Sequence, residues 1–145
     1  MIFFDASAAA KRYFQETGSD RVDELWGGEE FFFSLAILQC ELRSALNRKR
    51  RERALSRGAY HTLNRQVHED LKKIQTVPVD TELIQLSLRL LDSHPLKALD
   101  SLHLAGALGL QLALREPVLF VSADRQLLRA AQAEGLHTFN PEIGA

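Results

Sequence analysis

Short apolar runs without polar alternation recur along this chain, and stretches long enough for helices separate them. The clearest runs lie within residues 2–5, 31–33 and 118–121. A run of this kind is typical of a strand buried on both faces, as in a parallel sheet that helices cover from both sides. Because such runs and helical stretches alternate throughout, we expect an α/β fold with a mostly parallel sheet and helices on both faces.

Apolar side chains at helical spacing and capping residues mark the helices between these runs. Ser7 is the expected cap of the first helix. A strand at residues 77–79 is expected at an edge of the sheet, because Pro78 has no N–H to donate to a ladder. The expected strands are residues 2–5, 31–33, 77–79, 118–121 and 137–139, and the expected helices are residues 8–14, 20–26, 35–49, 57–74, 82–91, 98–114 and 125–134.

The totals limit the kind of protein this can be. The chain has 145 residues, so we expect a single domain over residues 1–145, and 46% hydrophobic residues are enough for a core. The formal net charge is −1, so a polyanionic partner would have to meet a local basic patch. Cys40 is the only cysteine, and no stretch of about 20 apolar residues is present. We therefore expect a cytoplasmic protein that does not span a membrane.

Four acids stand out by their positions. Asp5 directly follows the first apolar run, and Asp124 comes three residues after Val121, where the clearest run ends. In open parallel sheets, functional sites lie at the carboxyl ends of the strands. If the first and fourth strands are neighbours, these two carboxylates meet there. Glu41 and Asp100, on two expected helices, are candidates to complete the same site.

Carboxylates that come together from separate chain segments suit a divalent cation. Mg²⁺ prefers oxygen ligands, typically uses one or two carboxylates directly and keeps several waters, and Mn²⁺ accepts the same ligands. Such an ion would polarise a phosphodiester and lower the pKa of a water, so the acids indicate phosphodiester hydrolysis. Simpler explanations stay open at this point. Asp5 and Asp124 are also well placed to cap helices, Asp100 suits a helix dipole, and Glu41 suits a solvated helix face.

Four segments form motifs, and each contains one of the acids. They are IFFDAS at residues 2–7, ELRSAL at 41–46, HPLKALDSLHLA at 94–105 and VSADRQLL at 121–128. Together the motifs resemble those of the PIN-domain ribonucleases, and most closely the VapC-type toxins of bacterial and archaeal toxin–antitoxin modules. The resemblance extends over nearly the whole chain, and its strength lies in finding all four acids in this order and context.

The resemblance implies a Rossmann-like three-layer α/β/α sandwich with the strand order 3-2-1-4-5. It also implies an endoribonuclease that depends on Mg²⁺ or Mn²⁺. Asp5, Glu41, Asp100 and Asp124 match the acidic quartet of the family. Asp5, Asp100 and Asp124 would hold the metal, directly or through water, and Glu41 would orient or deprotonate the attacking water.

The resemblance further implies supporting residues and partners. Ser7 and Ser122 match small hydroxyl positions that help to shape the site. Members of the family are usually homodimers, and a cognate VapB-like antitoxin holds them inactive by covering the active groove. Operator DNA would be bound only indirectly, through the antitoxin.

Basic side chains near the motifs are candidates for RNA contact, although a solvated helix end is the usual explanation of a basic run. His103 follows Asp100 by three residues, so it either faces the site or closes the sheet. No His-x-x-x-His pair is present, which makes a zinc site improbable. The candidates for RNA contact are Lys11, Arg43, Arg48, Arg50 and Arg51.

A non-catalytic function is the alternative. A receiver-like signalling domain would need an acidic pair beside its phosphoacceptor, whereas Asp5 lies between Phe4 and Ala6. A PIN-like module that only binds RNA or protein would carry the same motifs. Metal binding in solution would separate that module from a nuclease.

Overall fold

The computed structural model describes residues 1–144, and its centre is a sheet of five parallel strands. Neighbouring strands lie in the order β3-β2-β1-β4-β5, and every pair is parallel. This confirms the predicted α/β fold and its strand order. The strands are β1 (Ile2–Phe4), β2 (Phe32–Leu35), β3 (Ile74–Val77), β4 (Leu119–Val121) and β5 (His137–Phe139).

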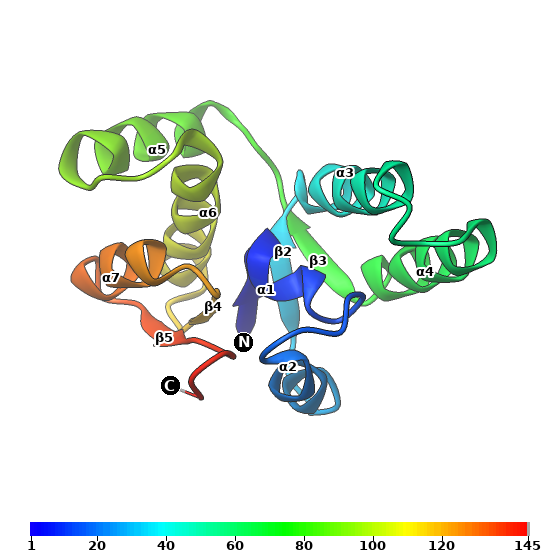
Figure 1. Cartoon of the computed structure of the whole chain (residues 1–145). Helices are drawn as coiled ribbons and strands as arrows, with labels where there is room; N and C mark the ends of the chain where they lie inside the picture. Colours follow the sequence, from blue (N-terminus) through cyan, green and yellow to red (C-terminus); the bar gives the residue numbers. More distant parts are fainter. Residues whose placement is uncertain (145) are drawn as a thin grey trace.

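Helices cover both faces of the sheet. Their bounds are α1 (Ala6–Ala10), α2 (Ser19–Trp26), α3 (Leu38–Arg51), α4 (Arg57–Leu71), α5 (Thr81–Ser93), α6 (Ala98–Leu114) and α7 (Arg125–Ala133). In Figure 1, α5, α6 and α7 lie on one side of the sheet, and α1, α2, α3 and α4 lie on the other. The chain therefore forms the expected three-layer sandwich. Within residues 1–144, no helix has the length and apolar character needed to cross a membrane.

Each face of the sheet has its own core, because successive side chains of a strand point to opposite faces. Phe3 packs in the core under α5, α6 and α7, whereas Ile2 and Phe4 pack in the core under α1, α3 and α4. Helix α6 approaches the sheet closely at Gly106. A Cβ atom there would lie 3.0 Å from the Phe3 ring and 3.1 Å from Leu35, so glycine sets how near α6 can come.

The first helix has a different cap from the one expected. Asp5, not Ser7, is the N-cap of α1, and its side chain accepts a hydrogen bond from the N–H of Ala8. The helix begins immediately after β1, so Asp5 is the residue with extended backbone at the boundary, and Ser7 already lies in the first turn.

The third strand also differs from the expectation. It spans Ile74–Val77 and not residues 77–79, although it does lie at the edge of the sheet, as predicted. Ile74 lies at helical spacing from Val67 and Leu71, and for this reason the predicted helix extends as far as residue 74. In the structure, Ile74 pairs with Phe32 of β2 instead.

Candidate active site

Asp5 lies at the carboxyl end of β1 with only 2% of its surface exposed. One oxygen, Oδ1, accepts hydrogen bonds from the N–H of Ala8 at 2.9 Å and from the Ser7 hydroxyl at 2.8 Å. The other, Oδ2, accepts from the Ser122 hydroxyl at 2.7 Å, and the Ser7 hydroxyl also lies 2.9 Å from it. Burial raises the pKa of Asp5, and these neutral donors offset only part of that effect.

Ser7 and Ser122 join the ends of β1 and β4 around this carboxylate. The Ser7 hydroxyl accepts a hydrogen bond from the N–H of Ala123 at 3.0 Å. The Ser122 hydroxyl accepts one from the N–H of Asp124, also at 3.0 Å. The two serines therefore connect Asp5 to the loop that carries Asp124, which is consistent with the supporting role expected for them.

Asp124 is the N-cap of α7. Its Oδ1 accepts hydrogen bonds from the N–H groups of Gln126 at 2.8 Å and Leu127 at 3.1 Å. The capping explanation considered for Asp5 and Asp124 is thus correct for both residues. Capping does not exclude a second task, because each carboxylate has two oxygens and about four lone-pair sites.

Asp100 lies in the first turn of α6 and is half-buried. Burial and the negative charge of Asp124 raise the pKa of Asp100, and the charge of Glu41 acts in the same direction. Asp100 is therefore near enough to both Asp124 and Glu41 for their charges to repel its own. This repulsion is what a bound cation would relieve.

Glu41 lies in the first turn of α3, and its side chain is 21% exposed. Its Oε1 is 2.6 Å from Nε2 of His103, which is buried on α6 one turn after Asp100. Of the two roles considered for His103, contact with the acidic residues is the one observed. The three-residue spacing from Asp100 was the only local signal for it, because Glu41 lies 62 positions away in the sequence.

The basic candidates fall into two groups. Lys11 is buried and its ammonium group lies 2.9 Å from Glu142 and 3.3 Å from Glu16, so it ties α1 to the C-terminal segment. Two carboxylates thus already neutralise the charge of Lys11, which leaves it less available for the RNA contact considered for it. The other four, Arg43, Arg48, Arg50 and Arg51, are exposed side chains of α3.

Two adjoining grooves run beside α3 towards these arginines, and the first of them reaches Glu41. The first, of about 630 Å³, runs between α1 and α3 and is lined by Ser7, Glu41 and Arg48 among others. The second, of about 590 Å³, follows α3 and α4 and reaches Arg43 and Arg51. Both grooves are lined by Cys40 and Ser44, so they meet along one face of α3.

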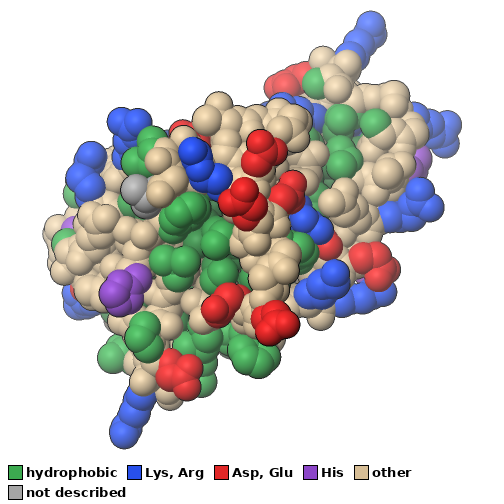
Figure 2. Space-filling model, turned by 90° about the horizontal axis from the view of Figure 1, so that it is seen from below, with side chains coloured by type: hydrophobic (Ala, Val, Ile, Leu, Met, Phe, Trp, Pro, Cys, Tyr) green, Lys and Arg blue, Asp and Glu red, His purple; other side chains and the backbone are tan. Residues whose placement is uncertain are grey.

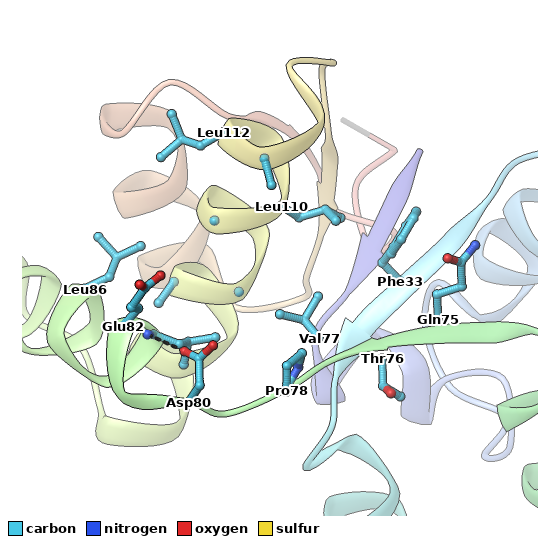
Figure 3. Close-up of a pocket in the computed structure, with 15 residues that line it drawn as sticks. Phe33, Gln75, Thr76, Val77, Pro78, Asp80, Glu82, Leu86, Leu110 and Leu112 are labelled. Carbon is cyan, nitrogen blue, oxygen red and sulfur yellow. Dashed lines mark hydrogen bonds between the residues drawn. The ribbon is translucent and has the colours of Figure 1, made fainter.

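A separate hollow of about 700 Å³ lies between β3, α5 and α6 (Figure 3). Of its two acids, Asp80 accepts a hydrogen bond from the N–H of Leu83 at 2.8 Å and so caps α5. The four candidate acids are not among its lining residues. The hollow is therefore distinct from the acidic site, and most of its lining is apolar, including Phe33, Val77, Leu86, Leu110 and Leu112.

The donor chemistry of the acidic site suits an oxygen-preferring divalent cation. Among the residues that the structure describes, no three His, Cys, Asp or Glu side chains are arranged to enclose a metal ion. A Mg²⁺ ion that keeps several waters needs only one or two direct carboxylates. The charge of Asp124 acts on Asp100, so at least two carboxylates lie close enough to interact with one ion. The residues present thus fit a largely hydrated ion.

Comparison with known proteins agrees with this geometry. The PIN domain family model matches residues 2–133, a range that contains all four acids. Two relatives from strains of Mycobacterium tuberculosis, Ribonuclease VapC45 (CDC 1551 / Oshkosh) and Ribonuclease VapC49 (ATCC 25618 / H37Rv), are each 31% identical over 136 residues. The match covers 93% of this chain and 92% of each relative. The chain therefore belongs to the PIN-domain family, among its VapC members, as its motifs predicted.

Proposed function

We propose that this chain is an endoribonuclease that depends on Mg²⁺ or Mn²⁺, and that it is the toxin component of a type II toxin–antitoxin module. One observation carries the proposal. Four acids lie around the carboxyl ends of β1 and β4, and no Lys or Arg within residues 1–144 forms an ion pair with any of them: Asp5, Glu41, Asp100 and Asp124. The names of the two relatives support RNA as the substrate.

In the proposed reaction, Asp5, Asp100 and Asp124 hold the cation, directly or through water. When bound, the ion would polarise the phosphodiester and lower the pKa of a nearby water. Glu41 orients that water and takes its proton as the water oxygen attacks phosphorus. The bond from phosphorus to the 3′ oxygen then breaks, and the 3′ oxygen takes a proton from a solvent water, leaving a 5′-phosphate and a 3′-hydroxyl. Hydrogen bonds from Ser7 and Ser122 support the proposal, because they hold Asp5 in one orientation.

The RNA would approach along the two grooves beside α3. Arg48 lines the groove nearer the acids, and Arg43 and Arg51 line the farther one. Arg50 packs its guanidinium over the Tyr60 ring at 4.6 Å, so part of its surface is occupied. Figure 2 shows the molecule from below the view of Figure 1, where several Asp and Glu side chains gather near the middle among scattered Lys and Arg side chains.

The family membership also supports the proposed partners. We propose a cognate VapB-like antitoxin that covers the active groove, and a homodimeric state. Contact with operator DNA would occur only through the antitoxin. A cytoplasmic location would bring the protein together with its RNA substrate.

Cleavage of total RNA by the purified protein tests the proposal. We expect discrete cuts with Mg²⁺ or Mn²⁺, none with EDTA, and a loss of at least about 100-fold in Asp5→Asn, since even residues that only support metal ligands change activity 10–100-fold. Asp92→Asn, an exposed residue of α5, is the matched control and should cut like the wild type. Product ends should be 5′-phosphate and 3′-hydroxyl, and a 2′,3′-cyclic phosphate would contradict the mechanism.

The same experiment addresses the alternative of a non-catalytic PIN-like module that binds RNA or protein. Cutting that is insensitive to EDTA, or equal in Asp5→Asn, would point to a contaminating nuclease. No cutting at all, together with no Mn²⁺ binding by calorimetry, would make the binding module the better explanation.

A further inference from the structure

His103 is a buried polar side chain at the acidic site that is neither an acid nor one of the two supporting serines. It is 1% exposed and sits on α6, one turn after Asp100. An imidazole removed from water costs free energy unless its nitrogens find partners. Its polar contact is therefore the feature that explains its presence in this position.

That contact defines which nitrogen carries the proton. A carboxylate can only accept a hydrogen bond, so the 2.6 Å contact between Nε2 of His103 and Oε1 of Glu41 assigns the hydrogen to Nε2. Nδ1 is buried and has no hydrogen-bond partner within the described part of the chain. Glu41 is thus the polar partner that the structure gives this ring.

The ring is held on a rigid element. Gly106, one turn further along α6, lets the helix lie so close to Phe3 and Leu35 that a Cβ atom there would be in unusually tight contact with both. Leu104 and Ala105 beside His103 are also fully buried. The position of His103 is therefore set by the packing of α6 on the sheet.

Glu41 has the opposite character. It has three side-chain torsions, is partly exposed and borders the groove that also reaches Ser7 and Arg48. Restricting such a side chain costs conformational entropy, which a charge-assisted hydrogen bond from a rigid donor offsets. The contact occupies Oε1 and leaves Oε2 without a protein partner among residues 1–144.

We propose that His103 is a positioning residue for the hydrolysis: its Nε2–H holds Oε1 of Glu41, so that Oε2 is presented to the attacking water. This inference rests on the proposed nuclease function. It assigns no contact between His103 and either RNA or metal, and so predicts an effect on turnover and not on substrate binding.

Four variants test the inference: His103→Leu, His103→Gln, Glu41→Gln and the double variant Glu41→Gln/His103→Leu. His103→Leu keeps the bulk but loses the donor, and should lower kcat about 10–100-fold while the KM for RNA and the Kd for Mn²⁺ change less than about threefold. His103→Gln carries an amide N–H near the Nε2 position and should recover most of kcat. The double variant should be no slower than Glu41→Gln, because His103 acts through Glu41.

An NMR measurement that does not depend on catalysis complements these rate measurements. In metal-free protein, the Nε2 proton of His103 should give a slowly exchanging NMR signal, and it should exchange faster in Glu41→Gln. If His103→Leu unfolds, His103→Asn replaces it, since the shorter amide lies near Nδ1 and does not reach Glu41.

The outcomes separate this inference from the proposed function. A wild type that cuts RNA with Mn²⁺, beside a His103→Leu variant of equal kcat, overturns the inference alone. Equal losses in His103→Gln and His103→Leu, or additive losses in the double variant, also overturn it, because they indicate a purely structural role. A wild type that neither cuts RNA nor binds Mn²⁺ overturns the proposed function and this inference together.

Discussion

Two aspartates of this molecule are almost equally buried but have very different surroundings. Asp5 is 2% exposed and Asp70 is 4% exposed. Asp70 accepts hydrogen bonds from the guanidinium of Arg12 at 2.7 Å and from the Tyr13 hydroxyl at 3.1 Å. Asp5 accepts only from two serine hydroxyls and a backbone N–H. Asp70 has a cationic partner built into the fold, whereas Asp5 forms no ion pair with any side chain of residues 1–144.

The surroundings of Arg12 show that the Asp70 cluster is complete in itself. Arg12 also pairs with Asp23 at 2.9 Å, and its guanidinium lies 4.6 Å from the centre of the Trp26 ring. Burial and the Asp70 charge raise the pKa of the Tyr13 hydroxyl, so it stays protonated and donates. A buried acid whose charge is matched in this way contributes to the fold. A buried acid at a strand end without a matching cation is available to one from solution, and this difference is the basis of the proposed metal site.

The substitution of Asp70 should have the largest effect on the stability of the fold. Asp70→Ala leaves the Arg12 guanidinium partly buried without its main partner, and we expect the free energy of unfolding to fall by about 3 kcal/mol. Cleavage per folded molecule should stay within about threefold of the wild type. Urea denaturation and RNA cleavage measure the two effects.

Asp5→Asn provides the contrasting variant. It should abolish cleavage while costing much less stability than Asp70→Ala, because no buried cation loses its partner. If Asp70→Ala lost activity as severely as Asp5→Asn, or if the two variants were equally destabilised, the distinction between a structural and a functional acid would fail.

The positions of Asp5 and Asp124 were readable from the sequence because strand ends are local features. An apolar run that stops at an acid predicts both the strand and the site at its carboxyl end, and the structure has both strands as neighbours. The order of the strands and the assignment of Glu41 and Asp100 came from the family motifs. Local periodicity could not predict the strand order or these two site residues, because it does not show which distant segments lie next to one another in the fold.

What the sequence did not reveal depends on long-range contacts. The nearer of the two carboxylate partners of Lys11 is Glu142, 131 positions away, so the sequence alone did not show that this lysine is buried in ion pairs. Glu41 looked solvated for the same reason, because its partner His103 is distant in the sequence. Ile74 continued a helical stripe by spacing, and only the ladder with β2 identifies it as a strand residue.

The contrast between matched and unmatched charges extends to the arginines, where a smaller effect is expected. Arg12 is neutralised by Asp70, whereas Arg43 and Arg51 form no ion pair within residues 1–144 and border the groove beside α3. Arg43→Gln/Arg51→Gln should weaken RNA binding about 3–10-fold. The slope of log K against log salt should become shallower by roughly 0.7 for each phosphate of single-stranded RNA that the variant no longer neutralises.

Binding is best measured in the Asp5→Asn background, so that the RNA is not cut. Lys73→Gln/Arg129→Gln removes the same charge from exposed positions that line neither groove. An equal change of slope in both double variants would show that only overall charge matters. An unchanged slope in Arg43→Gln/Arg51→Gln would remove these arginines from the RNA path.

The smallest effect concerns the pH dependence of stability at Asp100. Burial and the Asp124 charge raise the pKa of Asp100 above its ordinary value of 3.8, so the folded protein holds this proton more tightly than the unfolded chain does. The resulting stabilisation is present below about pH 4 and is lost as the pH rises through the folded-state pKa. Above its folded-state pKa and without metal, Asp100 is therefore a net cost to the fold.

Asp100→Asn should remove that cost. In EDTA at pH 7, we expect the variant to be more stable than the wild type by about 0.5 kcal/mol, a small value because the half-exposed carboxylate is partly screened. The difference should shrink towards zero as the pH is lowered to 4, whereas Asp92→Asn should show no such trend. Thermal unfolding from pH 4 to 7.5 measures this. A variant that is less stable than the wild type at pH 7 would mean that Asp100, like Asp70, already has its stabilising partners within the protein, and the case for an external cation at the site would weaken accordingly.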